Sequence, residues 1–126
     1  MNLKNMHTVK AVVCLAFGAL FLLVPGPLMS FFGVTLDPGG MFVARLYGAS
    51  LIGNLCLTWF SRNDPGSQAR NAAVLGLFVY DAIGFVVALA AVLSGVMNLF
   101  GWAVVLLYLF LTLGYGYFQF KKPAAA

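Results

Sequence analysis

Four apolar stretches, each long enough to cross a membrane as a helix, take up nearly all of this chain of 126 residues. A bilayer core is about 30 Å thick, and a helix crosses it with roughly 20 apolar residues. Because only short segments separate the stretches, the sequence predicts one transmembrane domain over residues 1–126, an all-α polytopic membrane four-helix bundle with short loops. The predicted spans cover about residues 9–31, 41–60, 72–93 and 99–120.

The composition of the chain argues against a soluble fold. Hydrophobic residues make up 63% of the chain and charged residues 8%, which is more apolar surface than a soluble core of this size can bury. The lipid bilayer is therefore the expected surrounding. The formal net charge of +4 comes from a few Lys and Arg residues beside the spans, so nucleic acid is not an expected partner.

The Lys and Arg residues that flank the spans fall on one side of the predicted bundle. Cytoplasmic segments of membrane proteins carry an excess of such residues. We therefore expect both termini and the loop between the second and third spans to lie in the cytoplasm, with the chain in the inner membrane of a bacterium. The residues concerned are Lys4, Lys10, Arg62, Arg70, Lys121 and Lys122.

The first stretch allows two interpretations. Lys4 and Lys10 precede a short apolar run, as in a signal peptide, but no A-x-A cleavage site follows the run. Pro25-Gly26-Pro27 interrupts the stretch, and the apolar residues after it extend it to spanning length. We expect a kinked first span, or one that ends in an interfacial turn.

Small residues recur along the later spans and allow helix backbones to approach closely, which drives helix association in lipid. Ala44-x3-Gly48 and Ala49-x3-Gly53 lie in the second span, so a compact bundle is expected. Residues 28–33 and 96–101 also resemble each other at the outer ends of spans, which hints at duplicated two-helix halves.

Arg45 and Asp81 are the ionisable residues that the prediction puts inside the membrane, where a charge is costly unless it is paired or hydrated. At a rise of about 1.5 Å per residue, Arg45 lies roughly 7 Å and Asp81 roughly 18 Å below the outer surface. Because the two depths differ by about two helical turns, a direct pair needs a tilt, a shifted register or a bridging water. The sequence leaves direct pairing open.

Asp81 has polar neighbours at its own predicted depth, since Asn54 and Thr112 both lie about 20 Å down their spans. We therefore predict an intramembrane polar cluster of Arg45, Asn54, Asp81 and Thr112. Two interpretations stay open for it. It is either a hydrogen-bond cluster that locks the bundle, or a site for a proton or cation.

Arg45 has interpretations of its own. Its side chain could extend to outer lipid head groups, or it could meet Asp37 in the first outer loop. It could also bind an anion or a lipid head group in an outward-facing cleft with Tyr47 and Tyr108.

Signatures of enzymes and metal sites are missing from the sequence. His7 is the only histidine and is expected to lie outside the first span, and Cys14 and Cys56 do not form a C-x-x-C pair. No Gly-rich phosphate loop, H-E-x-x-H motif or pair of carboxylates is present. We expect no enzymatic activity, no catalytic residue, no metal site and no cofactor.

Three short motifs lie between residues 25 and 62: Pro27-Leu28-Met29-Ser30-Phe31-Phe32-Gly33, then Ala44-Arg45-Leu46-Tyr47-Gly48, then Trp59 with Arg62. Together with the four-span shape, they resemble small bacterial inner-membrane proteins of the DoxX-like kind. That resemblance implies a quinone-linked or redox-complex subunit. The lysine expected near the outer end of the first span is absent, since residues 25–33 contain none.

Two hypotheses for the function follow from the sequence. In the first, the chain is a structural or accessory subunit of a membrane assembly, whose partner is another membrane protein or further copies of itself. In the second, it is a transporter or channel for a small solute, proton or ion that uses Asp81, Asn54 and Arg45.

Overall fold

The computed structural model of the chain describes residues 2–64 and 66–120. Within these residues there are five helices and no strand. Four of the helices are long and apolar enough to cross a membrane, which agrees with the predicted all-helical, multi-pass architecture. The helices are α1 (Leu3–Leu23), α2 (Pro25–Phe31), α3 (Pro38–Ser61), α4 (Gln68–Leu93) and α5 (Gly101–Phe120).

The first predicted span, residues 9–31, differs most from the structure. The side chain of Asn2 accepts a hydrogen bond from the amide of Asn5, so α1 begins at Leu3 rather than near Val9. At the other end, Val24 leaves the helical conformation, with φ −138° and ψ 59°, and Pro25 starts the separate helix α2. The span is therefore 21 residues long and shifted toward the N-terminus.

This shift corrects two expectations. From the sequence, His7 is expected outside the first span and Lys10 among the cytoplasmic flanking residues. Both residues lie within α1, and their side chains are buried. Of the other basic residues used for the orientation, Lys4, Arg62 and Arg70 are described by the structure, whereas Lys121 and Lys122 lie outside the described residues.

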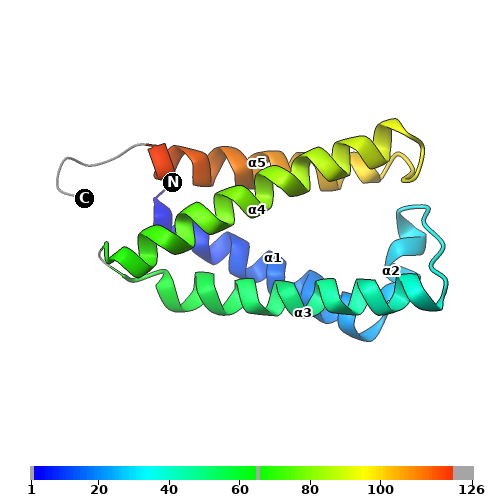
Figure 1. Cartoon of the computed structure of the whole chain (residues 1–126), viewed down its shortest axis with the longest axis horizontal. Coiled ribbons are helices and arrows are strands. Elements are labelled where there is room, and N and C mark those ends of the chain that lie inside the picture. Colours follow the sequence, from blue (N-terminus) through cyan, green and yellow to red (C-terminus); the bar gives the residue numbers. More distant parts are fainter. Residues whose placement is uncertain (1, 65, 121–126) are drawn as a thin grey trace.

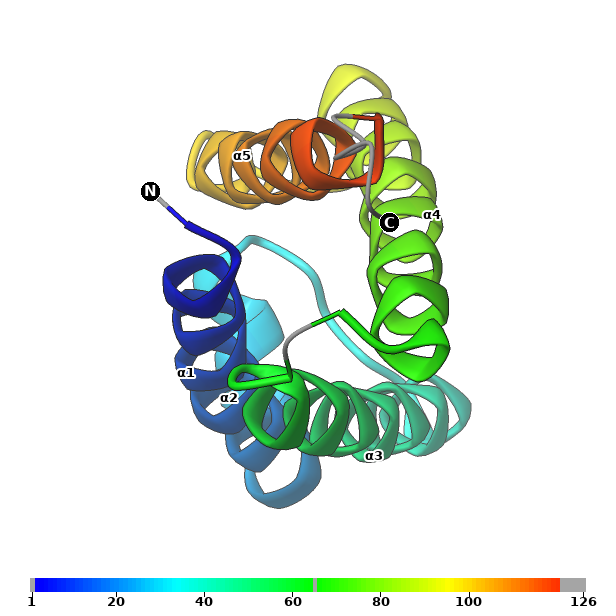
Figure 2. The same cartoon turned by 90° about the vertical axis from the view of Figure 1, so that its left-hand side faces the viewer.

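The four long helices run alternately up and down and form a ring in the order α1, α3, α4, α5 (Figures 1 and 2). The closest packing is between α1 and α3 and between α4 and α5, while contacts of α1 with α5 and of α3 with α4 are sparse. The bundle thus consists of two halves, an N-terminal half of α1, α2 and α3 and a C-terminal half of α4 and α5.

The two ends of the bundle differ in character. At one end lie Lys4, Arg62 and Arg70, near the start of α1 and the connection between α3 and α4, and we call it the basic end (Figure 1). At the opposite end lie α2 and the turn between α4 and α5, and we call it the hairpin end. The short helix α2 turns away from the axis of α1 across the hairpin end (Figure 1).

Glycines explain the close packing of α1 on α3. A Cβ atom at Gly48 would lie 2.9 Å from the carbonyl oxygen of Gly18 and 3.0 Å from the amide nitrogen of Leu22. These neighbours are backbone atoms and cannot move aside. The Ala44-x3-Gly48 pair is therefore on the helix contact, whereas Ala49 and Gly53 are exposed on another face of α3.

The hairpin end is tied together by Asn98, which follows α4. Its amide donates to the carbonyl of Phe32 at 2.8 Å, and its side-chain amide donates to the carbonyl of Phe31 at 3.0 Å. Gly33, with φ +82°, leaves room for the Asn98 side chain. The two similar segments noted in the sequence, residues 28–33 and 96–101, thus meet at this end.

The basic end is closed by apolar side chains from three helices. They form one buried cluster from α1, α4 and α5, so the two halves are in contact there. The members of this cluster, called the basic-end cluster, are Leu3, Met6, Val74, Leu77, Leu111 and Tyr115.

The connection between α3 and α4 is shaped by Asp64. Its carboxylate accepts hydrogen bonds from the amides of Ser67 and Gly66, both at 2.9 Å, and from the hydroxyl of Ser67. These bonds lower the pKa of Asp64 to about 2. Ser67 in turn caps the first turn of α4 by accepting from the amide of Arg70.

The glycine contact between α1 and α3 leads to a prediction. Gly48→Ala places a methyl group against backbone and should destabilise the fold by about 1–3 kcal/mol. Gly53→Ala, in the same helix, meets nothing within 4 Å and should be neutral or stabilising by up to about 1 kcal/mol, because alanine favours helix. Thermal unfolding of both variants in the same detergent checks this, and equal melting temperatures would contradict the assigned contact.

Candidate functional site

An ion pair lies in the interior of the bundle. The Nζ of Lys10 in α1 donates to Oδ1 of Asp81 in α4 at 2.5 Å. The two side chains are 2% and 0% exposed, so both charges are buried in the bundle. Because α1 and α4 are opposite in the ring, this contact crosses one diagonal of the bundle (Figure 2).

The surroundings of the ion pair satisfy only part of its polar surface. The ammonium of Lys10 also lies 4.9 Å from the centre of the Tyr80 ring, a distance at which the ring face attracts a cation. The second carboxylate oxygen of Asp81, Oδ2, is buried and has no hydrogen-bond partner among the described residues. One acceptor position next to the lysine is thus left open.

A second polar contact crosses the other diagonal. The hydroxyls of Tyr47 in α3 and Tyr108 in α5 form a hydrogen bond with each other. Tyr108 can reach this position because its ring packs directly on Gly84 of α4, where any side chain would collide with it. The hydroxyl of Tyr80 in α4 is buried close to this pair.

A third contact joins the halves closer to the basic end. His7 in α1 is fully buried, and its Nδ1 lies 2.8 Å from the hydroxyl of Tyr115 in α5. The other ring nitrogen of His7, Nε2, has no partner among the described residues. Three side-chain contacts, each made of one residue from either half, therefore connect the halves in the bundle interior.

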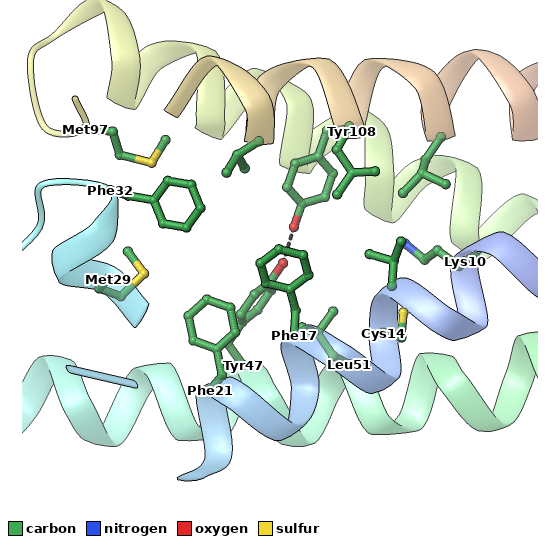
Figure 3. A pocket seen from close by; sticks show the side chains of 14 residues that line it. Lys10, Cys14, Phe17, Phe21, Met29, Phe32, Tyr47, Leu51, Met97 and Tyr108 are labelled. Atoms are coloured by element: carbon green, nitrogen blue, oxygen red, sulfur yellow. Dashed lines mark hydrogen bonds between the residues drawn. The ribbon is translucent and has the colours of Figure 1, made fainter. Parts of the chain in front are cut away.

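Between the halves lies a cavity of about 120 Å³, which we call the inner cavity. It extends from Lys10 and Cys14 past the Tyr47–Tyr108 pair toward the hairpin end (Figure 3). Apart from Lys10 and the tyrosines, its walls are apolar, with aromatic and Met side chains prominent. These are Val13, Cys14, Phe17, Phe21, Met29, Phe32, Leu51, Met97, Val104, Leu107 and Leu111.

The residues of the predicted polar cluster are not brought together. Asp81 pairs with Lys10, while Arg45 is exposed and its Nε donates to the carbonyl of Leu22 at 3.3 Å. Direct pairing of Arg45 with Asp81 is therefore absent. The side chains of Asn54 and Thr112 each have a buried atom without a hydrogen bond among the described residues, so they do not form a bonded layer with Asp81.

The residues of the predicted outer cleft are also only partly brought together. Tyr47 and Tyr108 do line a cavity, and they bond to each other inside it. Arg45 does not line the inner cavity, because its side chain is directed to the end of α1. Asp37, the other suggested partner of Arg45, instead caps α3 by accepting from the amide of Gly40.

Sequence reasoning missed Lys10, His7 and Tyr115. The predicted depth of Asp81 could have pointed to Lys10. It put the carboxylate closer to the membrane surface with the basic residues than to the surface near Arg45. His7, Lys10 and Cys14 follow one another at spacings of three and four, which places them on one face of a helix. Tyr115 had the position of an ordinary interfacial aromatic residue.

No group of three or more His, Cys, Asp or Glu side chains that could hold a metal ion occurs among residues 2–64 and 66–120. Cys14 lines the inner cavity and Cys56 is exposed, and both are free thiols. The inner cavity thus offers a ligand hydrogen-bond donors, a compensated charge and the thiol of Cys14.

Comparisons with known protein families, with characterised proteins and with solved protein structures find no match for this chain. The DoxX-like resemblance thus remains an expectation from the sequence.

The ion pair gives the prediction for this site. Lys10→Met and Asp81→Asn each leave a buried polar group without its partner and should destabilise the fold by about 3–5 kcal/mol. The double variant should lose less than the sum of the two, because neither charge is left behind. Denaturant unfolding of the four proteins in one detergent measures this, with Lys4→Met at an exposed position as the control. Strictly additive losses would show that the pair does not couple.

Proposed function

We propose that the chain is an accessory subunit of a membrane assembly and that it holds a small, lipid-soluble molecule of the quinone type in the inner cavity. The observation that carries this proposal is that Lys10, held by its buried pair with Asp81, lines one end of a cavity whose other walls are apolar except for Tyr47 and Tyr108. An ion pair in the membrane interior contributes little net stability for its desolvation cost, so a role in binding is the better explanation of its presence.

The size of the inner cavity supports a ligand head group of one ring. Apolar protein cavities of about 150 Å³ stay free of water and admit a benzene molecule. The inner cavity measures about 120 Å³, which is close to that size. A substituted ring fits if its substituents extend past the Tyr47–Tyr108 pair toward the hairpin end.

The chemistry of the walls supports a flat ring with acceptor oxygens. Phe and Met side chains pack well on an aromatic or quinoid face. The ammonium of Lys10 and the hydroxyls of Tyr47 and Tyr108 are donors that a carbonyl oxygen can accept from. A quinone meets these requirements, and the resemblance to DoxX-like proteins implies the same class of molecule.

The location of the protein is part of the proposal. We infer that the basic end faces the cytoplasm and that the membrane is a bacterial inner membrane. The supporting residues at that end are Lys4, Arg62 and Arg70, all exposed or partly exposed, whereas the hairpin end carries Asp37.

Transport of a proton or small solute is the second candidate, and the open Oδ2 of Asp81 favours it. The basic-end cluster of buried side chains from α1, α4 and α5 argues for holding a ligand instead. Proton flux into proteoliposomes that carry the protein, lost in Asp81→Asn, would favour transport.

The binding proposal predicts saturable binding of duroquinone, a tetramethyl benzoquinone that cannot add to the thiol of Cys14. Val104 lines the inner cavity, so Val104→Phe should weaken binding by about tenfold or more by filling the space. Leu106→Phe, on the exposed face of the same helix, should leave binding unchanged. Titration calorimetry in lipid nanodiscs measures both. Absence of saturable binding to the unaltered protein would refute the proposal.

The proposed orientation predicts which loops are reached from outside. In a protein whose own cysteines are replaced by alanine, Thr35→Cys at the hairpin end should react with a membrane-impermeant maleimide on intact bacterial cells. Asn63→Cys at the basic end should react only after the cells are permeabilised. Both positions are exposed in the structure, so a reversed pattern would mean the opposite orientation.

A further inference from the structure

A second, wider space opens beside the inner cavity, between α3 and α4, where the helices contact each other sparsely. It has a volume of about 760 Å³ and we call it the side opening. The two spaces adjoin, since six residues line both. These shared residues are Phe21, Met29, Tyr47, Met97, Val104 and Tyr108.

The walls of the side opening are suited to a hydrocarbon chain. None of its described lining residues carries a charge. Many are small, which lets a chain lie close to the backbones of α3 and α4. The residues that belong to the side opening alone are Val34, Leu36, Gly39, Gly40, Val43, Ala44, Tyr80, Ile83, Gly84, Val87, Ala88, Ala91 and Val96.

Part of the side opening faces the lipid, while its end at Val34, Leu36 and Val96 belongs to the hairpin end. The lining residues Val43 in α3 and Val87 in α4 are each 62% exposed, and both lie within helices that are long and apolar enough to span the membrane. Exposed side chains within a membrane-spanning helix contact the acyl chains of the bilayer. A molecule dissolved in the bilayer therefore reaches the inner cavity without passing through water.

We propose that the ligand carries a single hydrocarbon tail, which lies in the side opening between α3 and α4 while its ring lies in the inner cavity. This inference rests on the proposed function and narrows the ligand to single-tailed, single-ring lipids. The tail is a separate claim, because a ring without a tail could also occupy the inner cavity.

The Tyr47–Tyr108 pair marks the boundary that the ring has to cross. Both tyrosines line both spaces, and their hydroxyls form a hydrogen bond with each other (Figure 3). Once the ring is inside, a carbonyl oxygen can accept from either hydroxyl, which replaces the bond that the ring displaced. The same two side chains then hold the ring and border its tail.

The test uses two probes with the same head, duroquinone and the homologue in which a decyl chain replaces one methyl group. Neither adds to a thiol. Equilibrium binding is measured in nanodiscs for a double variant that fills the side opening, Val43→Trp with Val87→Trp. The control is Leu46→Trp with Val86→Trp in the same helices, since Leu46 and Val86 are 54% and 63% exposed and do not line the opening.

We expect the variant that fills the side opening to bind the decyl quinone about tenfold more weakly and to bind duroquinone as the unaltered protein does. The control variant should bind both probes normally. Comparing variants with one probe at a time removes the effect of the decyl tail on the concentration of probe in the bilayer.

The outcomes separate this inference from the proposed function. If duroquinone fails to bind the unaltered protein, the proposed function is wrong and the tail site falls with it. If duroquinone binds but the decyl quinone is not weakened by the filled opening, or is weakened equally in the control, the tail does not lie there. Should the double variant not fold, Ala91→Phe in the opening and Ala90→Phe outside it replace the pair.

Discussion

The buried ion pair between Lys10 and Asp81 is the interaction on which the interior arrangement depends. It joins α1 and α4, two helices that are opposite in the ring and whose backbones do not come close to each other. The tyrosine pair on the other diagonal acts at the next level toward the hairpin end. In both contacts, side chains from opposite helices meet in the bundle interior, and space remains around them. The inner cavity exists because opposite helices are joined by side chains and their backbones do not pack against each other.

Hydrophobicity alone predicted three of the spans well, because residues 41–60, 72–93 and 99–120 are uninterrupted apolar runs bounded by polar turns. The first span was misplaced for a local reason. Asn2 caps a helix that begins among polar residues, and Pro25 ends it early, whereas hydropathy records only the average over the run. Lys10 then looked like a flanking charge, and His7 looked external.

The candidate site was harder to predict than the fold. Asp81 was found because a carboxylate in an apolar run is conspicuous, and its depth correctly weakened the case for Arg45 as its partner. Choosing Lys10 instead requires knowing that α1 and α4 are diagonal neighbours, which depends on the order of helices around the ring. The pairing of Tyr47 with Tyr108 likewise depends on Gly84, whose missing side chain matters only once α5 packs on α4.

The charges of the site have a consequence for its response to voltage. Moving one elementary charge through the full membrane potential involves about 2.3 kcal/mol per 100 mV. Lys10 and Asp81 neutralise each other, and the described walls of the side opening carry no charge. A neutral ligand that follows this route moves no net charge across the electric field. The membrane potential would therefore have little direct influence on how strongly the proposed ligand occupies the site, and its concentration in the bilayer would decide the occupancy.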